Sequence, residues 1–336
     1  MRFFLLTILF LLGSSSAWAA ELIRLYEWLP GRSQAPLILP VKASESPEEA
    51  ARRYLQNLTN QPDIVELFEG KAPELSIQNF KPLNDTTRES RALLIANLPK
   101  DYTQDSLRVT NFKKIFADGG HTSYILPLVA DIGLSQSESR DFHKQIAEKF
   151  PFMVAMGGDD VAPHFYGQEN FHSGRTIPAR DQFEIRLIKS YVAQGKGFLL
   201  GICRGSQISS VALGYKMIQD IPFHIGEKVA HSDHWHNIEI KDTQHQLLRS
   251  LVGAEKSLHV NSLHHQSVIF KEGGPLQLAA QSPDGITEAT EFKNGRGLLL
   301  QFHPELMNNN LGSKILWKVL EQKNKVMPRT CSRLFL

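Results

Sequence analysis

Cysteine is scarce in this sequence, and charge is nearly balanced. Only two of the 336 residues are cysteines, Cys203 and Cys331, which excludes a framework of several disulfide bonds. The formal net charge is +2 and the basic residues are dispersed, so the sequence offers no basic surface for nucleic acid. With 42% hydrophobic and 21% charged residues, the chain is typical of a globular protein. Because nothing indicates nucleic acid, a small molecule or a peptide is the expected partner.

The longest apolar run lies at the start of the sequence. Residues 1–20 combine a charged Arg2, an apolar core over 3–12 and the small-x-small pattern Ala17-Trp18-Ala19. This combination is typical of a signal peptide and predicts a periplasmic or secreted protein without a permanent membrane anchor. An uncleaved anchor is the alternative. The basic tail, residues 326–336, contains Cys331, which we expect to stay unpaired.

The segment 21–90 has no pattern that predicts a chemistry. Ser46 is a good helix cap and Pro47 a good first helical residue, and the helix is expected to continue to Leu58. A second short helix is expected over 62–68. We therefore predict a small helical N-terminal extension of unknown role.

After Arg91 the pattern changes to short apolar runs that alternate with amphipathic stretches. This is typical of a mostly parallel sheet with helices on both faces, and we assign it to one α/β domain over 91–325. Strands are expected at 92–96, 124–128 and 152–156 and in the apolar run that begins at 197 and leads to Cys203, and helices at 106–117, 137–150 and 180–194. The second half is rich in strands, which are expected at 235–240, 276–280, 286–292 and 297–302.

Cys203 stands between an apolar run and a helix start, with Gly201 and Gly205 two residues to either side. This arrangement is typical of a nucleophile elbow, where small neighbours let other backbone pass close to a strained residue. The amides at the start of the helix would face the sulfur and favour its thiolate form. A buried structural cysteine is the alternative.

A cysteine nucleophile needs a base, and the last expected strand ends in His303-Pro304-Glu305. A carboxylate bonded to one ring nitrogen would aim the other nitrogen at the sulfur and stabilise the imidazolium. On its own the tripeptide is a weak signal, since it also occurs in exposed turns.

Together these stretches resemble the class I glutamine amidotransferase-like superfamily, and more narrowly its γ-glutamyl-γ-aminobutyrate hydrolase branch. The elbow over 201–205 and the segment 301–305 carry the resemblance, with further matches, in order, at 157–163, 166–167, 180–184, 219–221, 260–266 and 284–289. The resemblance covers about 91–320 and implies a flavodoxin-like fold with a Cys-His-Glu triad.

The resemblance also implies a role for each matched residue. Cys203 would attack a γ-glutamyl amide, His303 would transfer protons, and Glu305 would orient His303. The backbone amides of Gly158 and Arg204 would form the oxyanion hole. The residues expected to contact the substrate are Gln207, His264, His265, Gln266, Ser267 and Asp159.

Other polar groups invite chemical interpretations of their own. His231, His234 and His236, with Asp233, have spacing that would suit zinc, but we expect a loop without a metal and no cofactor. His264 or His265 could replace His303 as the base, but neither has an adjacent carboxylate.

Acidic residues in the first half allow two further interpretations. Asp159 and Asp160 could form an acid–base pair, although loop capping or contact with a substrate amine fits their glycine-rich setting better. Arg180, Asp181 and Glu184 are expected to form a helix start with internal charge pairs.

The sequence therefore predicts an exported cysteine hydrolase of γ-glutamyl amides, which could form oligomers. A glutaminase subunit that supplies ammonia to a separate synthetase is one alternative. A non-catalytic exported binding protein of the same fold is another.

Overall fold

A computed structural model describes residues 21–31, 33–68, 75–97, 99–102, 106–226, 228–307 and 310–326. The expected signal peptide over 1–20 and Cys331 in the basic tail lie outside the described residues. Among the described helices, none has the length and apolar character that crossing a membrane requires.

The strands follow one another along the whole described chain. They are β1 (Ile23–Trp28), β2 (Leu37–Lys42), β3 (Phe80–Pro82), β4 (Arg91–Ile95), β5 (Thr122–Leu126), β6 (Phe152–Ala155), β7 (Phe198–Ile202), β8 (Lys216–Ile218), β9 (His234–Ile240), β10 (Ser257–Ser262), β11 (Ser267–Ile269), β12 (Leu276–Gln281), β13 (Thr287–Phe292) and β14 (Gly297–Leu300).

Helices alternate with strands in the first two thirds of the chain. The α-helices are α1 (Pro47–Thr59), α2 (Pro62–Leu67), α3 (Leu107–Asp118), α4 (Gln136–Lys149), α5 (Pro178–Gln194), α6 (Arg204–Ala212), α7 (Ile221–Ile225), α8 (Leu247–Val252) and α9 (Asn310–Val326). Short 3-10 helices are η1 (Asp85–Ser90), η2 (Pro99–Tyr102), η3 (Pro163–Tyr166) and η4 (Pro304–Leu306).

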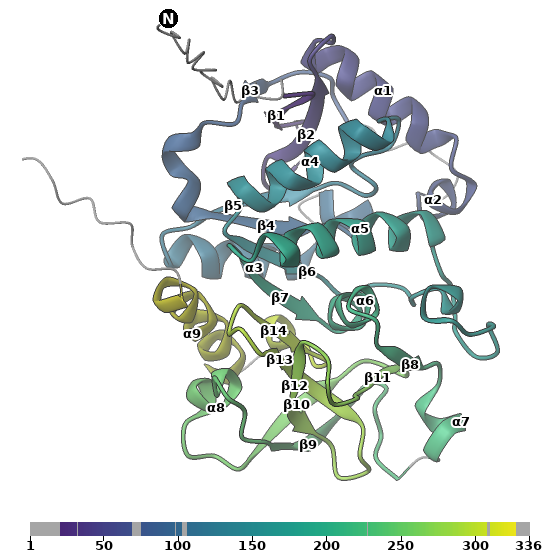
Figure 1. Ribbon diagram of the computed structural model, residues 1–336, viewed down its shortest axis with the longest axis vertical. Coiled ribbons are helices and arrows are strands. Elements are labelled where there is room, and N and C mark those ends of the chain that lie inside the picture. The colour runs from purple at the N-terminus through teal and green to yellow at the C-terminus, as the bar shows by residue number, and fades with distance from the viewer. Residues whose placement is uncertain are drawn as a thin grey trace, which may run out of the picture.

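One large sheet organises the molecule (Figure 1), with strand order β10-β9-β12-β13-β14-β7-β6-β4-β5-β2-β1-β3. The strands from β14 to β2 in this order pair in parallel, and the strands outside them pair antiparallel. Helices α4 and α5 lie in front of the central strands in Figure 1, and α3 lies behind them. The predicted α/β fold, with a parallel core and a strand-rich second half, is confirmed.

The N-terminal extension contains the two helices that the sequence predicts, and α1 begins at a capping box formed by Ser46 and Glu49. The prediction of a small helical extension is nevertheless incomplete. Strands β1, β2 and β3 also belong to this segment and add to the edge of the main sheet beside β5. The sequence did not predict β2 as a strand, because Pro36 precedes it and Pro40 lies within it, and proline is a poor strand former in general.

Two glycines let the elbow strand and its helix approach their neighbours closely. A Cβ atom on Gly205 would lie 1.8 Å from the carbonyl oxygen of Ala155 in β6. A Cβ on Gly201 would lie 2.7 Å from the Leu299 side chain and 2.9 Å from the Gly205 carbonyl oxygen. The sequence-based expectation of small residues around Cys203 is therefore explained by backbone that passes within contact distance.

We expect Gly205→Ala to lower the free energy of unfolding by about 3 kcal/mol or more, because the added methyl group meets backbone that cannot rotate away. Gly31→Ala is the matched control, since among the described residues a Cβ there meets only the Ser76 hydroxyl oxygen, at 3.9 Å. Denaturant unfolding of both variants measures the difference. Equal stabilities of the two variants would contradict this account of the elbow.

Candidate active site

Cys203 lies between the end of β7 and the start of α6, in a backbone conformation that few residues adopt. Its φ is 52° and its ψ is −114°, as expected of the strained residue at a nucleophile elbow. Its amide donates to the carbonyl oxygen of Leu300 in β14 at 2.7 Å, which fixes the turn against the next strand. The residue is 7% exposed, so the sulfur is enclosed at the carboxyl edge of the parallel strands.

The expected oxyanion donors, the amides of Arg204 and Gly158, belong to backbone segments next to Cys203. Arg204 is the first residue of α6, where an amide has no carbonyl one turn earlier in the helix to bond. Gly157 adjoins the site from β6, since a Cβ on it would lie 2.9 Å from the His303 ring and 3.5 Å from Cβ of Cys203. The Gly157 carbonyl accepts from Asn97 Nδ2 at 3.1 Å. In a trans peptide this directs the Gly158 amide to the opposite side.

His303 and Glu305 form a buried pair directly after β14. The Nδ1 atom of His303 lies 2.8 Å from Oε1 of Glu305. Burial alone would lower the pKa of His303, but attraction to Glu305 and then to Cys203 outweighs it and raises the pKa to about 10. At neutral pH the ring is therefore the imidazolium that stabilises a thiolate.

Asn261 holds the backbone of His303 from β10. Its Nδ2 donates to the His303 carbonyl at 2.9 Å, and its Oδ1 accepts from the His303 amide at 2.9 Å. Asn261 lies in the matched segment 260–266, but no role could be derived for it from the sequence, because β10 was not predicted. It is a positioning residue for the histidine.

The side chain of Arg204 points away from the sulfur into a buried ionic network. Its guanidinium donates to Glu184 at 2.6 Å and to Asp181, both on α5. Asp181 also accepts from the Ala162 amide at 2.8 Å, and Arg180 donates to the Asp159 carbonyl at 3.0 Å. The expected helix start with charge pairs is present, but its main cation comes from the elbow.

Burial strongly affects these charges. It lowers the pKa of Arg180, helped by repulsion from Arg204, to about 10. Burial also raises the pKa of Glu184, against the attraction of Arg204. Arg180 stays charged at neutral pH, so two cations face the carboxylates of Asp181 and Glu184.

Five of the six residues expected to contact substrate, Gln207 and the segment 264–267, form a wall beside the elbow, and we call this set the substrate wall. Gln207 Nε2 donates to the Gln266 carbonyl at 3.2 Å, and Gln266 Nε2 donates to the Ser173 hydroxyl at 2.8 Å. Ser267 begins β11 and donates to the Thr287 carbonyl at 3.0 Å. The ring of His264 is turned toward Glu288, and its amide donates to the His231 carbonyl at 3.0 Å.

The glycine-rich loop contributes its two aspartates differently. Asp159 pairs with Arg175 of the same loop at 2.9 Å. Asp160 caps the Gly174 amide at 2.7 Å and meets Nε2 of His265 at 3.0 Å. Asp160 is thus the aspartate that reaches the predicted substrate wall, and the loop-capping expectation is confirmed for it.

Three further side chains converge on His264 next to this wall. One possible ligand atom from each of His231, His236, His264 and Glu288 lies within 4.8 Å of the other three. His234, which the sequence grouped with His231 and His236, is exposed and outside the cluster. Sequence spacing missed His264 and Glu288 as neighbours because β10 and β13 bring them in from distant positions.

Comparisons with known proteins identify the family to which the chain belongs. A model of the Peptidase C26 family matches residues 108–305. The glutamine amidotransferase-like protein YvdE of Lactococcus lactis subsp. lactis is 34% identical over 211 residues, which is 61% of this chain and 80% of YvdE. Protein NtpR of Enterococcus hirae is 33% identical over 198 residues, 55% of this chain and 77% of NtpR. The chain belongs to the Peptidase C26 family and has the class I glutamine amidotransferase-like fold.

Solved structures with similar folds are more distant. A glutamine amidotransferase of Thermotoga maritima matches with 17% identity and a TM-score of 0.45, over 71% of this chain and 93% of that one. A glutamine amidotransferase of Methylobacillus flagellatus matches with 14% identity and a TM-score of 0.48, over 74% and 99% of the chains.

Loss of the buried cation should destabilise the protein. We expect Arg204→Met to lower the free energy of unfolding by about 3–5 kcal/mol, because it leaves Asp181 and Glu184 buried without their main partner. Arg175→Met is the control, since Arg175 is half-exposed and its pair with Asp159 should contribute about 1 kcal/mol or less. Denaturant unfolding separates the two. Similar losses in both variants would refute a central role for Arg204.

The His265 ion pairs should make stability depend on pH. Its hydrogen bond to Asp160, against burial and with help from Asp220, raises the pKa of His265 from 6.5 to about 9. A raised pKa gives stability that is complete below pH 6.5 and is lost as the pH rises toward 9. The melting temperature of wild type should therefore exceed that of His265→Gln most at pH 5.5–6.5, and the excess should shrink up to pH 9.5.

The control for this measurement is His259→Gln. The His259 ring nitrogen contacts the Asn237 side-chain oxygen at 3.0 Å, which is not ionisable. The difference in melting temperature between His259→Gln and wild type should be constant over the same pH range. A flat difference for His265→Gln as well would rule out the ion pairs.

Proposed function

We propose that this protein is an exported hydrolase of γ-glutamyl amide bonds with Cys203 as nucleophile, His303 as proton-transfer group and Glu305 as the orienting carboxylate. The observation that carries the proposal is the strained elbow at Cys203 beside the buried His303–Glu305 pair. Membership of the Peptidase C26 family supports hydrolysis, and the named relative YvdE supports a glutamine-like substrate.

The proposed reaction has two halves that balance. In the first, the thiolate of Cys203 bonds to the γ-carbonyl carbon, the C–N bond breaks, and His303 gives its proton to the leaving amine. In the second, water attacks the γ-glutamyl thioester while His303 takes a proton from it, and the C–S bond breaks. Glutamate is released and the thiolate with its imidazolium partner is restored.

Each tetrahedral intermediate carries a negative oxygen that needs donors. The proposed donors are the amides of Gly158 and Arg204, which come from the ends of β6 and β7. The Arg204 side chain anchors one of them to α5, and Asn97 orients the peptide that supplies the other. Loss of one such donor typically costs roughly 10²–10³ in rate.

The substrate's amino-acid head group would lie along the wall formed by Gln207 and the segment 264–267. The buried Oε1 atom of Gln266 makes no hydrogen bond within the described residues, so it is available as an acceptor for an ammonium group. Asp160 and His265 bring one negative and one positive group to the same wall. These features suit a zwitterionic head group, and the leaving amine would extend toward the glycine-rich loop.

The proposed export rests on residues 1–20, whose pattern is that of a signal peptide. Mass spectrometry of the protein recovered outside the cytoplasm would show a mature N-terminus after Ala19 or Ala20. Recovery of the full sequence from the cytoplasm alone would refute export and leave the chemistry untouched.

Activity is tested with purified protein and a panel of γ-glutamyl amines, γ-glutamyl peptides and glutamine. We expect Cys203→Ala to abolish release of glutamate, and Glu305→Gln to lower kcat by roughly 10²–10⁴, because the imidazole loses its orienting partner. Cys331→Ser, which changes the other cysteine, should keep full activity.

Two results would overturn the proposal. One is a wild-type protein that cleaves no member of the panel, which would favour a non-catalytic binding protein. The other is equal activity of Cys203→Ala and wild type. Release of ammonia from glutamine without cleavage of any γ-glutamyl amine would favour the glutaminase alternative.

A further inference from the structure

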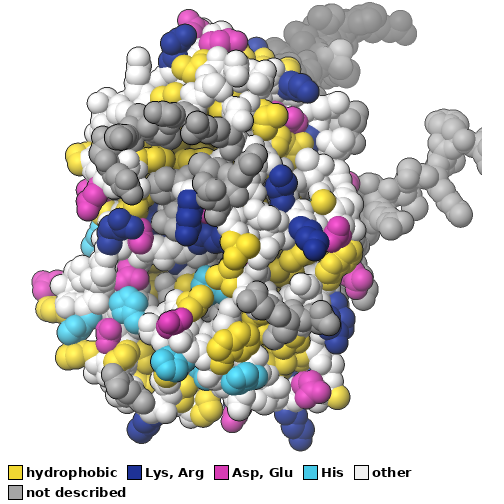
Figure 2. Space-filling view, turned by 180° about the vertical axis from the view of Figure 1, so that it is seen from behind, with side chains coloured by type: hydrophobic (Ala, Val, Ile, Leu, Met, Phe, Trp, Pro, Cys, Tyr) yellow, Lys and Arg dark blue, Asp and Glu magenta, His cyan; other side chains and the backbone are white. Residues whose placement is uncertain are grey.

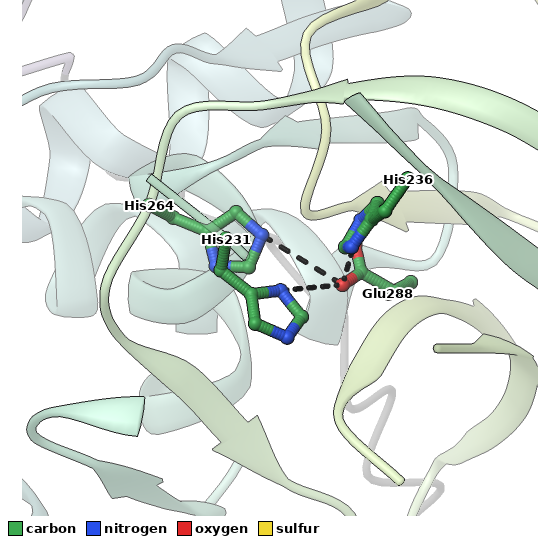
Figure 3. A group of neighbouring side chains, drawn as sticks. All are labelled: His231, His236, His264 and Glu288. Carbon is green, nitrogen blue, oxygen red and sulfur yellow. Dashed lines mark ion pairs between the residues drawn. The ribbon is translucent and has the colours of Figure 1, made fainter. Parts of the chain in front are cut away.

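A buried cluster of three histidines and one glutamate lies behind the substrate wall (Figure 3). His236 belongs to β9 and Glu288 to β13, whereas His231 precedes β9 and His264 follows β10. The four residues are 7%, 0%, 4% and 5% exposed, respectively. Four separate segments therefore direct polar side chains into one enclosed point.

Most of the polar atoms that face one another in this cluster lack hydrogen bonds. Within the described part of the chain, both carboxylate oxygens of Glu288, both ring nitrogens of His236, Nδ1 of His231 and Nε2 of His264 have no hydrogen-bond partner. Burial of an unsatisfied carboxylate is costly, and buried polar groups in folded proteins are almost always paired. So many buried atoms without a hydrogen bond in one place indicate that the cluster binds a ligand or an ion.

The three distances from Glu288 fit ligands around a metal better than hydrogen-bonded ion pairs, and the four possible ligand atoms all lie within 4.8 Å of one another. Glu288 Oε1 lies 3.3 Å from His231 Nδ1, 3.4 Å from His236 Nε2 and 3.7 Å from His264 Nε2. Charge-assisted hydrogen bonds are usually about 2.7–2.9 Å long. Ligands about 2.0–2.1 Å from a tetrahedral Zn²⁺ are separated by about 3.3–3.4 Å.

Two of the histidines are held in the tautomer that a metal requires. His231 Nε2 lies 3.0 Å from Asp284, which accepts the ring proton and leaves the Nδ1 lone pair toward Glu288. His264 Nδ1 lies 3.0 Å from the Gln266 carbonyl, which leaves the Nε2 lone pair toward Glu288. Metal-binding histidines commonly donate their second ring nitrogen to a carboxylate or a carbonyl in this way.

We propose that His231, His236, His264 and Glu288 bind one Zn²⁺ ion in a closed, four-coordinate structural site. Imidazole and carboxylate ligands suit zinc, and three nitrogens with one oxygen complete a tetrahedron without an open position. This proposal replaces the sequence-based expectation of a loop without a metal. It excludes His234 and Asp233, which had suggested zinc by their spacing alone.

The site would hold the substrate wall and the strand before His303 in position without contacting the reacting atoms. The Gln266 carbonyl that accepts from His264 also accepts from Gln207 at 3.2 Å. The Glu288 carbonyl accepts from the amide of Gln301, two residues before His303, at 2.8 Å. A metal that fixes Glu288 and His264 thus fixes both the substrate wall and the strand that leads to the histidine.

The test measures metal directly and does not depend on any enzyme activity. The full chain is purified without a histidine tag, stripped with a chelator, and titrated with Zn²⁺ and with Co²⁺. We expect one Zn²⁺ per chain by mass spectrometry of the metal, a rise in melting temperature on binding, and the visible absorption of tetrahedral Co²⁺.

A graded set of variants assigns the ion to this cluster. Asp284→Asn changes the partner of His231 Nε2 and leaves all four ligands in place, so it should weaken Zn²⁺ binding about 10–100-fold. Glu288→Gln and His236→Gln remove ligands and should weaken it further. Histidines also gather on the surface of this half of the molecule (Figure 2), so the exposed His259→Gln is the control and should bind one Zn²⁺ as wild type does.

Absence of stoichiometric Zn²⁺ and Co²⁺ binding by the wild-type chain would overturn the proposal, and this result is independent of whether the ligand variants fold. So would a His259→Gln variant that loses the ion while Glu288→Gln keeps it. Octahedral rather than tetrahedral Co²⁺ absorption would overturn the closed four-coordinate geometry.

Discussion

The ion pairs of Arg204 with Asp181 and Glu184 are the interaction on which the arrangement of the site depends. The backbone of Arg204 belongs to the elbow, whereas its guanidinium is buried between two carboxylates of α5. Because the guanidinium is a rigid planar fork, two carboxylates fix its position and its orientation. The first turn of α6, and with it the amide next to Cys203, is thereby fixed relative to the parallel part of the sheet.

The other half of the site is fixed from the antiparallel side. His303 follows β14, which pairs in parallel with the elbow strand β7, and Asn261 of β10 holds its backbone amide and carbonyl. Sulfur and imidazole thus come from adjacent strands, while their supports come from α5 on one side and β10 on the other. Neither the parallel core nor the antiparallel half would align the pair alone.

The sequence predicted those helices and strands whose own hydrophobic pattern identifies them. Strands β4, β6, β7, β9, β12 and β13 and helices α1, α3, α4 and α5 lie within about two residues of their expected positions. The elbow and the His303–Glu305 pair were also predictable, since each lies within five residues of sequence. Asn261 and Glu288 were not assigned their contacts, because these depend on the register of antiparallel strands far apart in the chain.

The strands of the N-terminal extension form one edge of the large sheet. A parallel sheet that ended at β5 would present a row of free amides and carbonyls to any other extended chain. Here β2 and β1 lie beyond β5, and the outermost strand is β3, three residues long and containing Lys81 and Pro82. A short strand with a lysine and a proline is a poor template for further pairing. The extension therefore places a strand with little capacity for further pairing at this edge of the sheet, where copies of the protein would otherwise meet an open edge.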